Sequence, residues 1–363
     1  MNIDEIYMRM ALSLAKKGIG GASPNPMVGA VVVKNGKIVG KGYHKRYGEA
    51  HAEVNALNDA GPKAKGATLY LNLEPCCHFG KTPPCTDSVI KARIKRVVAG
   101  MTDPNPKVSG KGFDILKKAG IEVSAGILEE ECRSLNEGFI KRIKTGRPFV
   151  ILKIAASLDG KTATRNKESK WITSEASRRS VHRLRGRVDA IMTGIGTVVA
   201  DDPLLTPRVG RIKKAPLRVV VDSLLKVPDS AKVVDRGTLF VATERAPDNK
   251  VRLLESSGAK VIRFPSKDGK VDLTALMSFL GMKGINTVMV ESGPELSASL
   301  LMAGLVDKVL FFYAPKIIGG TEAPGMVGGD GIERLSDAIN LRDIRIKRFG
   351  EDIMIEGYVH RNN

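Results

Sequence analysis

The stretch HAEVNALNDAGPKAKGATLYLNLEPCCHFGKTPPC, residues 51–85, combines alternating secondary structure with a high density of metal-binding side chains. Its first ten residues have the pattern of a helix, and residues 68–73 (TLYLNL) have the apolar, β-branched character of a buried strand. A second helix is expected directly after Pro83-Pro84, because proline is favoured at the first turn of a helix. This succession of helix, strand and helix favours a layered α/β domain.

Cysteine and histidine residues gather in the same region. Six of the nine in the chain lie between residues 44 and 85: His44, His51, Cys76, Cys77, His78 and Cys85. In a chain without a secretion signal, such a cluster indicates a metal site rather than disulfide bonds. Cys132 stands apart from this cluster, and we interpret it as a buried apolar residue.

The order His51-Ala-Glu53, Pro75-Cys76 and Cys85 is typical of zinc sites that hydrolyse amino groups. In such sites one His and two Cys hold the metal, water takes the fourth position, and a Glu that is not a ligand moves protons. Zinc lowers the pKa of its water to about 7, and a nearby carboxylate can accept that proton. We therefore expect His51, Cys76 and Cys85 as ligands and Glu53 as the catalytic residue.

The spacing of the cysteines leaves alternatives open. Eight residues separate Cys76 from Cys85, whereas two separate the cysteines in the usual signature. Cys77 competes with Cys76 as a ligand, but adjacent side chains diverge, so both are not expected on one ion. With His78 as a fourth ligand the site would be a closed structural zinc, and Glu53 would then have no function.

The rest of the first half continues the α/β pattern. The first eighteen residues are expected to form a helix with Ile6, Met10 and Leu14 on its apolar face. Residues 28–33 and 37–42 flank Asn35-Gly36 and are expected to form a β-hairpin. The further elements expected are strand 96–100, helix 112–119, strand 121–124 and a charged helix within residues 129–148.

A Gly/Pro break at residues 144–148 (KTGRP) divides the chain, so we expect one domain over residues 1–146 and another over 147–363. The second half opens with an apolar strand at 149–155. More strands are expected at 190–193, 217–221, 239–243, 261–264, 287–290 and 309–313, with helices at about 174–186, 249–257, 272–282 and 294–303. The second domain is therefore also predicted to be α/β.

Two turns in the second half suit phosphate groups. Gly194-Ile-Gly196 follows a strand, and Asp222 ends another strand 26 residues later, as in part of a dinucleotide-binding fingerprint. However, Val199 stands where a third glycine would be needed. Gly293-Pro294 opens a helix whose first backbone N–H groups suit a phosphate. A G-x-G alone is common, and an ordinary tight turn between strand and helix explains the second segment equally well.

Composition narrows the class of protein. Of the 363 residues 42% are hydrophobic and 27% charged, as in ordinary globular proteins. No apolar run reaches the roughly 18 residues of a membrane span, and the N-terminus lacks the pattern of a signal peptide, so we expect a cytoplasmic protein with no membrane partner. The net charge of +19 is spread over both halves and fits RNA or small anionic substrates. Aromatic residues make up only 5%, few for stacking bases, so we expect no nucleic-acid partner.

Long motifs of the chain resemble one family. SPNPMVGAVVV (23–33), HAE (51–53), LEPCCHFGKTPPC (73–85) and TDPNP (102–106) closely resemble the deaminase half of the bifunctional riboflavin-biosynthesis deaminase/reductase. KIAASLDGKTAT (153–164), SKWITSEASR (169–178), TGIGTVVADDPLLT (193–206), VESGPEL (290–296) and APKIIGG (314–320) are similar to its reductase half. In that family the insert between the two cysteines is a regular feature. Most members are expected to carry Ser in place of Cys77, a difference that should not disturb the metal.

The resemblance implies a cytidine-deaminase-like three-layer α/β/α domain followed by a dihydrofolate-reductase-like α/β domain, with Zn²⁺ and NADPH as cofactors. It implies hydrolytic deamination of 2,5-diamino-6-(5-phosphoribosylamino)pyrimidin-4(3H)-one, a small phosphorylated pyrimidine. NADPH would then reduce the ribosyl chain to ribityl, giving 5-amino-6-(5-phosphoribitylamino)uracil. A homo-oligomer, either a dimer or a tetramer, is also expected. A nucleic-acid-editing zinc deaminase with an accessory binding domain is the alternative.

The resemblance also assigns residues by matching motif. The pyrimidine pocket of the deaminase falls on Asn25, His44 and Lys81. The nicotinamide-nucleotide contacts fall on Ala155, Trp171, Thr197, Asp201, Ser223, Gly293, Pro294, Glu295, Leu296, Ser297, Ala298 and Ser299. The reductase substrate contacts fall on Ser169, Arg185, Leu205, Arg208 and Glu291. Arg185 and Arg208 are expected to hold the 5-phosphate, since guanidinium groups match phosphate geometry. Lys153, Asp201 and Glu291 are equally placed as proton donors for the reduction.

Overall fold

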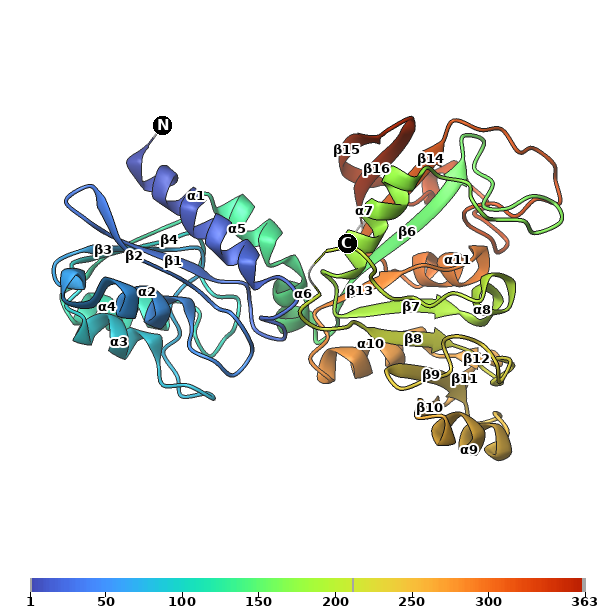
Figure 1. Ribbon diagram of the computed structural model, residues 1–363, viewed down its shortest axis with the longest axis horizontal. Helices are drawn as coiled ribbons and strands as arrows, with labels where there is room; N and C mark the ends of the chain where they lie inside the picture. The colour runs from blue at the N-terminus through green and yellow to red at the C-terminus, as the bar shows by residue number, and fades with distance from the viewer. Residues whose placement is uncertain (1, 211, 361–363) are drawn as a thin grey trace. The chain divides into compact units, whose positions relative to one another are not determined.

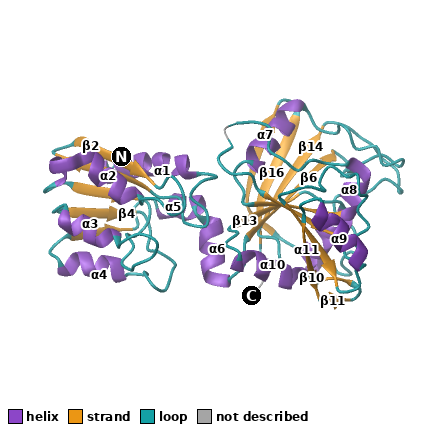
Figure 2. Cartoon of the chain, turned by 60° about the horizontal axis from the view of Figure 1, so that its bottom comes forward, coloured by secondary structure: helices purple, strands orange, loops and turns teal. Residues whose placement is uncertain are grey.

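A computed structural model of the chain describes residues 2–210 and 212–360. The chain divides into two compact units, Met1–Gly146 and Arg147–Asn363, which run from blue to teal and from green to red in Figure 1. Each unit is built on one large β-sheet with helices packed against it (Figure 2). Among the described residues, none of the helices combines the length and the apolar character that crossing a membrane requires.

The first unit contains a five-stranded sheet of order β2-β1-β3-β4-β5. β1 pairs antiparallel with β2 and β3, and β3, β4 and β5 are parallel. The strands are β1 (Gly29–Lys34), β2 (Lys37–Tyr43), β3 (Thr68–Leu71), β4 (Arg96–Ala99) and β5 (Glu122–Ala125). The helices are α1 (Ile3–Ala15), α2 (Ala52–Ala60), α3 (Cys85–Lys91), α4 (Lys111–Lys118), α5 (Glu129–Leu135) and α6 (Glu137–Thr145). Figure 1 shows α1 and α5 on one face of the sheet and α2, α3 and α4 on the other, which makes the three layers expected.

Two glycines allow helices to approach the hairpin closely from both sides. A Cβ on Gly29 would lie 2.1 Å from the carbonyl oxygen of Ala11 in α1, and a Cβ on Gly42 would lie 2.3 Å from that of Ala52 in α2. Gly29 pairs with Tyr43, the neighbour of Gly42, so the two glycines face opposite sides of the sheet. Any side chain at either position would push a helix away from the sheet.

The first helix buries a different face from the one predicted. Met10 is 39% exposed, and Ile6 and Leu14 are only partly buried. The apolar residues of α1 that the sheet buries are Tyr7, Met8, Ala11, Leu12 and Ala15. This face carries the small residues that fit against Gly29, and the closeness of that contact decides which side of the helix turns inward.

The charged segment after residue 129 forms two helices instead of the single one predicted. α5 ends and α6 begins at Asn136, which is 2% exposed. Its side chain accepts from the Met27 N–H at 2.8 Å and donates to the Met27 carbonyl at 3.0 Å. This buried contact spans 109 positions of the sequence, so local helical pattern could not indicate it.

The second unit contains a nine-stranded sheet of order β10-β9-β8-β7-β13-β6-β14-β16-β15. All neighbours from β10 to β14 are parallel, and β16 and β15 add an antiparallel edge. The strands are β6 (Phe149–Ser157), β7 (Ala190–Gly194), β8 (Leu217–Val221), β9 (Thr238–Thr243), β10 (Lys260–Phe264), β13 (Thr287–Val290), β14 (Lys308–Ala314), β15 (Leu341–Phe349) and β16 (Asp352–Val359). β11 (Ser266–Lys267) and β12 (Lys270–Val271) form a separate hairpin. The helices are α7 (Glu175–Arg185), α8 (Ile195–Asp201), α9 (Asp248–Ser256), α10 (Leu273–Met282) and α11 (Pro294–Met302).

Helices cover both faces of this sheet. Phe149 and Ile151 of β6 belong to a core with residues of α7, α8 and α9, whereas Val150 and Leu152 belong to a core with residues of α10 and α11. A strand that is buried on both faces has a nearly continuous apolar sequence, as residues 149–155 (FVILKIA) of β6 do. The helices leave the carboxyl ends of the parallel strands uncovered, and this is where α/β sheets bind ligands.

The sequence analysis did not anticipate β11, β12, β15 or β16. β15 has the sequence LRDIRIKRF and is exposed along almost its whole length, so it lacks the alternation of a half-buried strand. Its position is instead set by antiparallel pairing with β16.

Candidate functional site

Three predicted ligands converge in the first unit at the starts of two helices. His51 is the residue before α2, Cys85 is the first residue of α3, and Cys76 lies in the loop after β3. The His51 Nδ1 atom lies 3.5 Å from the Cys76 Sγ atom and 3.3 Å from the Cys85 Sγ atom. Within the described part of the chain, these three residues alone form a group whose ligand atoms all lie within 4.8 Å of one another.

These distances fit a tetrahedral zinc ion. Zinc binds nitrogen at about 2.0 Å and sulfur at about 2.3 Å, so a tetrahedral ion separates the two atoms by about 3.5 Å. The observed nitrogen–sulfur distances of 3.5 and 3.3 Å match that value. Three protein donors also leave one coordination position for water, as in catalytic zinc sites. His78 does not belong to the group, which speaks against the closed site considered above.

Glu53 lies in the first turn of α2, two residues after His51, and is only 3% exposed. Burial raises the pKa of its carboxyl group to about 7. A group with such a pKa can both accept and release a proton near neutral pH, which general acid–base catalysis requires. Hydrogen bonds with Cys85 and His51 lower the pKa of the Cys76 thiol, and the thiolate is the form that binds metal.

Further side chains fix the histidines around the candidate zinc site. Thr82 Oγ1 lies 3.5 Å from the second ring nitrogen of His51, Nε2, and such a contact holds the ring with Nδ1 toward the metal. Asn25 Nδ2 lies 3.2 Å from His44 Nε2, and His44 Nδ1 lies 3.2 Å from the Ala50 carbonyl. The rings of His44 and His51 meet edge to face at 5.1 Å. His44 thus lies beside the predicted ligand His51, and Asn25 beside His44.

Two of the remaining predicted positions lie on the loop between the cysteines. The Lys81 ammonium lies over the Tyr47 ring, 4.1 Å from its centroid. The Cys77 Sγ atom points to the Lys107 carbonyl oxygen at 3.8 Å, not to the cluster of ligands. Cys132 is fully buried in the apolar core.

Glu74 is a supporting residue that the sequence analysis missed. Its buried carboxylate accepts hydrogen bonds from the backbone N–H groups of Asp103, Gly110, Gly112 and Phe113, at 2.9–3.3 Å. It thereby ties the segment that follows β4 to the loop that carries Cys76. Its position directly before Pro75-Cys76 was the available signal, but the groups that donate hydrogen bonds to a carboxylate cannot be identified from sequence.

A large cavity of about 1550 Å³ opens in the second unit at the ends of the parallel strands. It is lined by residues that follow β6, β7, β8 and β13, together with α7 and the β11–β12 hairpin. The predicted reductase residues that line it are Ala155, Ser169, Trp171, Arg185, Thr197, Asp201, Arg208, Ser223, Glu291, Gly293, Pro294, Glu295, Leu296 and Ser299. Leu205, Ser297 and Ala298 do not line it; they are buried, at 2%, 0% and 5% exposure.

A buried group of charges lies between the end of β13, which Glu291 follows, and the middle of β6, which contains Lys153. Glu291 accepts two hydrogen bonds from Arg185, at 2.6 and 3.0 Å, and lies 3.6 Å from the Lys153 ammonium. Burial alone would raise the pKa of Glu291, but Arg185 and Lys153 hold it at about 2. Burial lowers the pKa of Lys153, which Glu291 partly offsets. Glu291 is therefore a carboxylate near neutral pH.

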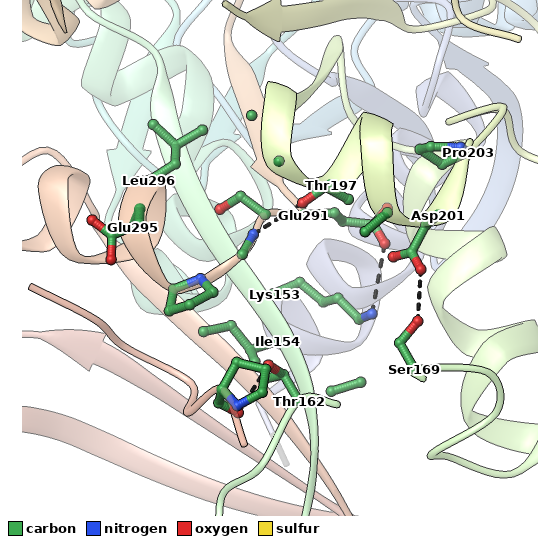
Figure 3. Close-up of a pocket in the computed structure, with 18 of the residues that line it drawn as sticks. Lys153, Ile154, Thr162, Ser169, Thr197, Asp201, Pro203, Glu291, Glu295 and Leu296 are labelled. Atoms are coloured by element: carbon green, nitrogen blue, oxygen red, sulfur yellow. Dashed lines mark hydrogen bonds and ion pairs between the residues drawn. The ribbon is translucent and has the colours of Figure 1, made fainter. Parts of the chain in front are cut away.

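Polar contacts join the other segments around the cavity (Figure 3). The Ser169 hydroxyl donates to Asp201 at 2.6 Å, and the Gly293 N–H donates to the Thr197 hydroxyl at 3.1 Å. Trp171 is 62% exposed, and the Arg178 guanidinium lies over its ring at 4.6 Å. The indole lies at the cavity wall, and its contact with the nicotinamide nucleotide stays a prediction.

Sequence reasoning also missed two cavity residues on α7. Arg178 and His182 line the cavity with Arg185. Their spacing of four and three residues places all three on one face of a helix, and this periodicity of basic residues was a usable signal.

Comparisons with known proteins match both units to protein families. Residues 148–355 match the family model of the RibD C-terminal domain, and residues 1–101 match that of the cytidine and deoxycytidylate deaminase zinc-binding region. Riboflavin biosynthesis protein RibD of Bacillus amyloliquefaciens is 45% identical over 357 residues, which are 97% of this chain and 95% of that protein. The Escherichia coli (strain K12) protein of the same name is 45% identical over 365 residues, which are 97% and 98% of the two chains. The chain belongs to the RibD family.

Solved structures extend the match to the fold. Acinetobacter baumannii RibD (form 1) has a TM-score of 0.90 at 37% identity and covers 99% of both chains. A Thermotoga maritima protein described as a diaminohydroxyphosphoribosylaminopyrimidine deaminase/5-amino-6-(5-phosphoribosylamino)uracil reductase has a TM-score of 0.87 at 35% identity, also covering 99% of both chains.

As a RibD protein, the chain is a bifunctional deaminase and reductase of riboflavin biosynthesis. The predicted fold class is confirmed, and so are the predicted cofactors, zinc for a deaminase domain and NADPH for a reductase domain of the RibD type. The alternative of a nucleic-acid-editing deaminase is set aside, because the RibD C-terminal domain occupies the second half of the chain.

Proposed function

We propose that the first unit deaminates 2,5-diamino-6-(5-phosphoribosylamino)pyrimidin-4(3H)-one and that the second reduces the product to 5-amino-6-(5-phosphoribitylamino)uracil. The observation that carries this proposal is the buried Glu53 beside three ligand atoms spaced for zinc. The domains are proposed to be residues 1–146 for the deaminase and 147–363 for the reductase.

In the deaminase, His51, Cys76 and Cys85 hold the zinc, which activates water at neutral pH when bound. Glu53 accepts one proton of that water and passes it to the ring nitrogen as the water oxygen adds to C2. It then takes the remaining hydroxyl proton and passes it to the amino group on C2, which leaves as ammonia while the C2 carbonyl forms. Asn25, His44 and Lys81 orient the pyrimidine. The contact of His44 with Asn25 keeps both side chains in position before the substrate arrives.

Glu53→Gln tests this assignment. The substitution keeps the size of the side chain and the three ligands but removes the group that accepts protons. We expect the zinc content to remain at the wild-type level while kcat for deamination falls by about 10²–10⁴. Deamination by the Gln variant at the wild-type rate would remove Glu53 from the mechanism.

In the reductase, bound NADPH would supply the hydride for C1′ of the ribosyl group, and the protein supplies position and charge. Arg185 is engaged by Glu291 and donates to the Thr206 carbonyl at 3.3 Å. Arg208 lines the cavity, and none of the ion pairs among the described residues includes it, so it has the freer guanidinium for the 5-phosphate. A Glu291 carboxylate cannot donate a proton, and the Asp201 carboxylate accepts from the Ser169 hydroxyl, which leaves the Lys153 ammonium as the donor.

NADPH oxidation tests the second activity. We expect oxidation to require the deaminated pyrimidine and to continue unchanged in the Glu53→Gln variant, because the two sites lie in different units. If the Glu53→Gln variant, supplied with the deaminated pyrimidine, oxidised NADPH as slowly as it deaminates, the proposal of two separate sites would be contradicted.

We also propose that the enzyme is a cytoplasmic homo-oligomer. All four cysteines are free, which suits a reducing compartment. Ile344 and Ile346 of the edge strand β15 are 49% and 66% exposed, and apolar residues on an unpaired edge favour contact with a second copy. Sedimentation analysis should give a dimer or tetramer, and a monomer at micromolar concentration would contradict this part of the proposal.

A further inference from the structure

The β11–β12 hairpin forms one wall of the cavity of the second unit, and it lies outside all the motifs that resemble the reductase family. Lys267 and Lys270 are exposed residues of this hairpin, and both line the cavity. The Val271 N–H donates to the Ser223 hydroxyl at 3.3 Å. This contact ties the hairpin to the segment directly after β8, so the two lysines border the same end of the cavity as Ser223.

The strand order indicates what this end would hold. β6, β13, β7 and β8 are successive neighbours, and each contributes residues to the cavity where it ends. Gly293, after β13, opens helix α11, whose first N–H groups suit a pyrophosphate. With the nicotinamide near Ala155 of β6, a dinucleotide that crosses at Gly293 extends its adenosine toward Ser223 and the hairpin.

The carboxylate that would favour NAD at this end of the cavity does not face the cavity. In enzymes of the NAD type, an acid at the end of the second strand binds the ribose 2′-hydroxyl. Asp222 occupies that kind of position, but it is 1% exposed and does not line the cavity. Its carboxylate accepts from the Val227 N–H at 2.8 Å within its own turn. The ribose would therefore meet Ser223 and not a carboxylate.

Two lysine ammonium groups at this end have no carboxylate partner among the ion pairs of the described residues. Of three lysines that line it, Lys232 pairs with Asp202 at 3.1 Å. Neither Lys267 nor Lys270 takes part in an ion pair among the described residues. Two acids lie beside them: Asp268 at the tip of the hairpin, and Asp272, whose carboxylate already accepts hydrogen bonds from the Thr274 and Ala275 N–H groups. A free ammonium group binds phosphate as a point charge.

We propose that Lys267 and Lys270 bind the 2′-phosphate of NADPH and so make the reductase select NADPH over NADH. The inference rests on the proposed function of this cavity as the NADPH site. It assigns cofactor selectivity to the short hairpin and not to a glycine-rich fingerprint.

Titration of the full-length protein with NADPH and with NADH, followed by nicotinamide fluorescence, tests the proposal without turnover. For the Lys267→Ala/Lys270→Ala double variant we expect the Kd of NADPH to rise at least about ten-fold while the Kd of NADH changes less than about two-fold. Lys260→Ala is the matched control. It removes an exposed lysine at the start of β10, the opposite end of the strand from the hairpin, and should change neither Kd. Thermal unfolding of each variant checks that the fold is kept.

The outcomes separate the two proposals. If wild-type protein binds neither dinucleotide, the cavity is not the NADPH site and both proposals fail. If wild-type protein prefers NADPH and the double variant keeps that preference, the hairpin proposal is overturned while the reductase site stands. An equal loss of NADPH and NADH binding would also overturn it, because the lysines would then not act through the 2′-phosphate.

Discussion

His51 and Glu53 lie two positions apart, and the start of helix α2 gives them different environments. His51 has an extended backbone conformation before the helix, so its ring can reach the two cysteines. Glu53 is inside the first turn and buried, and the loss of water around the carboxyl group raises its pKa to about 7. Coordination and proton transfer are thereby divided between neighbouring residues.

Arg208 offers a test at a single side chain. Removing its guanidinium in Arg208→Ala should raise the KM of the reductase for the phosphorylated pyrimidine about ten-fold or more, because a charge-assisted phosphate contact is lost. The kcat should change little, and the Kd of NADPH should remain the same. Steady-state kinetics with the deaminated product gives all three readings, and an unchanged KM would assign the phosphate to another residue.

The residues that sequence could identify are those whose spacing is set by chemistry. His51, Cys76 and Cys85 were predicted because few residue types hold zinc, and the structure brings their ligand atoms together. Thr82 and Glu74 were not predicted, since a hydroxyl or an acid has many possible partners. Leu205, Ser297 and Ala298 were assigned by resemblance only, and they lie behind the cavity wall.

At the scale of elements, helix α1 is anchored to the sheet by a buried carboxylate. Asp4 accepts two hydrogen bonds from Arg96, at 3.0 and 2.9 Å, and one from the Tyr70 hydroxyl at 2.8 Å. The hydrogen bonds from Arg96 lower the pKa of Asp4 below its usual value of 3.8. This contact joins the first helix to strands β3 and β4.

Asp4→Asn should therefore lower the free energy of unfolding of the first unit by about 1–3 kcal/mol at pH 7. Because the folded pKa lies below the unfolded one, the contribution is fully present above about pH 4 and is lost as the pH falls through the folded pKa. Urea unfolding at pH 7, 5 and 3 should show the wild type and the variant converging only at the lowest pH. Asp114→Asn, at an exposed position of α4, is the control, and a difference that is independent of pH would refute the anchor.

A second prediction at the scale of elements concerns Glu74, which holds the segment between β4 and α4. Glu74→Gln keeps the shape but places an amide N–H₂ against backbone N–H donors, so about 2 kcal/mol of stability should be lost. The melting temperature should fall, whereas the exposed substitution Glu130→Gln should leave it unchanged. Retention of the wild-type melting temperature by Glu74→Gln would show that the segment is held in another way.

For the whole molecule, the alternation of helices and strands in the sequence was enough to indicate two α/β layered units. The edge of the second sheet formed by β16 and β15 could not be predicted from this alternation. β15 is charged and exposed, and its place depends on pairing with β16, which is a tertiary contact. The prediction of a single helix after residue 129 was wrong for the same reason, since the break at Asn136 depends on a contact with the distant Met27.

Zinc content and product identity, measured in one preparation of the full chain, test the central claim most directly. The account predicts about one zinc per chain, deaminated pyrimidine and ammonia without NADPH, and the ribityl product when NADPH is added. After removal of zinc by a chelator, deamination should stop while reduction of the deaminated pyrimidine continues. Deamination at an undiminished rate in the zinc-free protein would contradict the account.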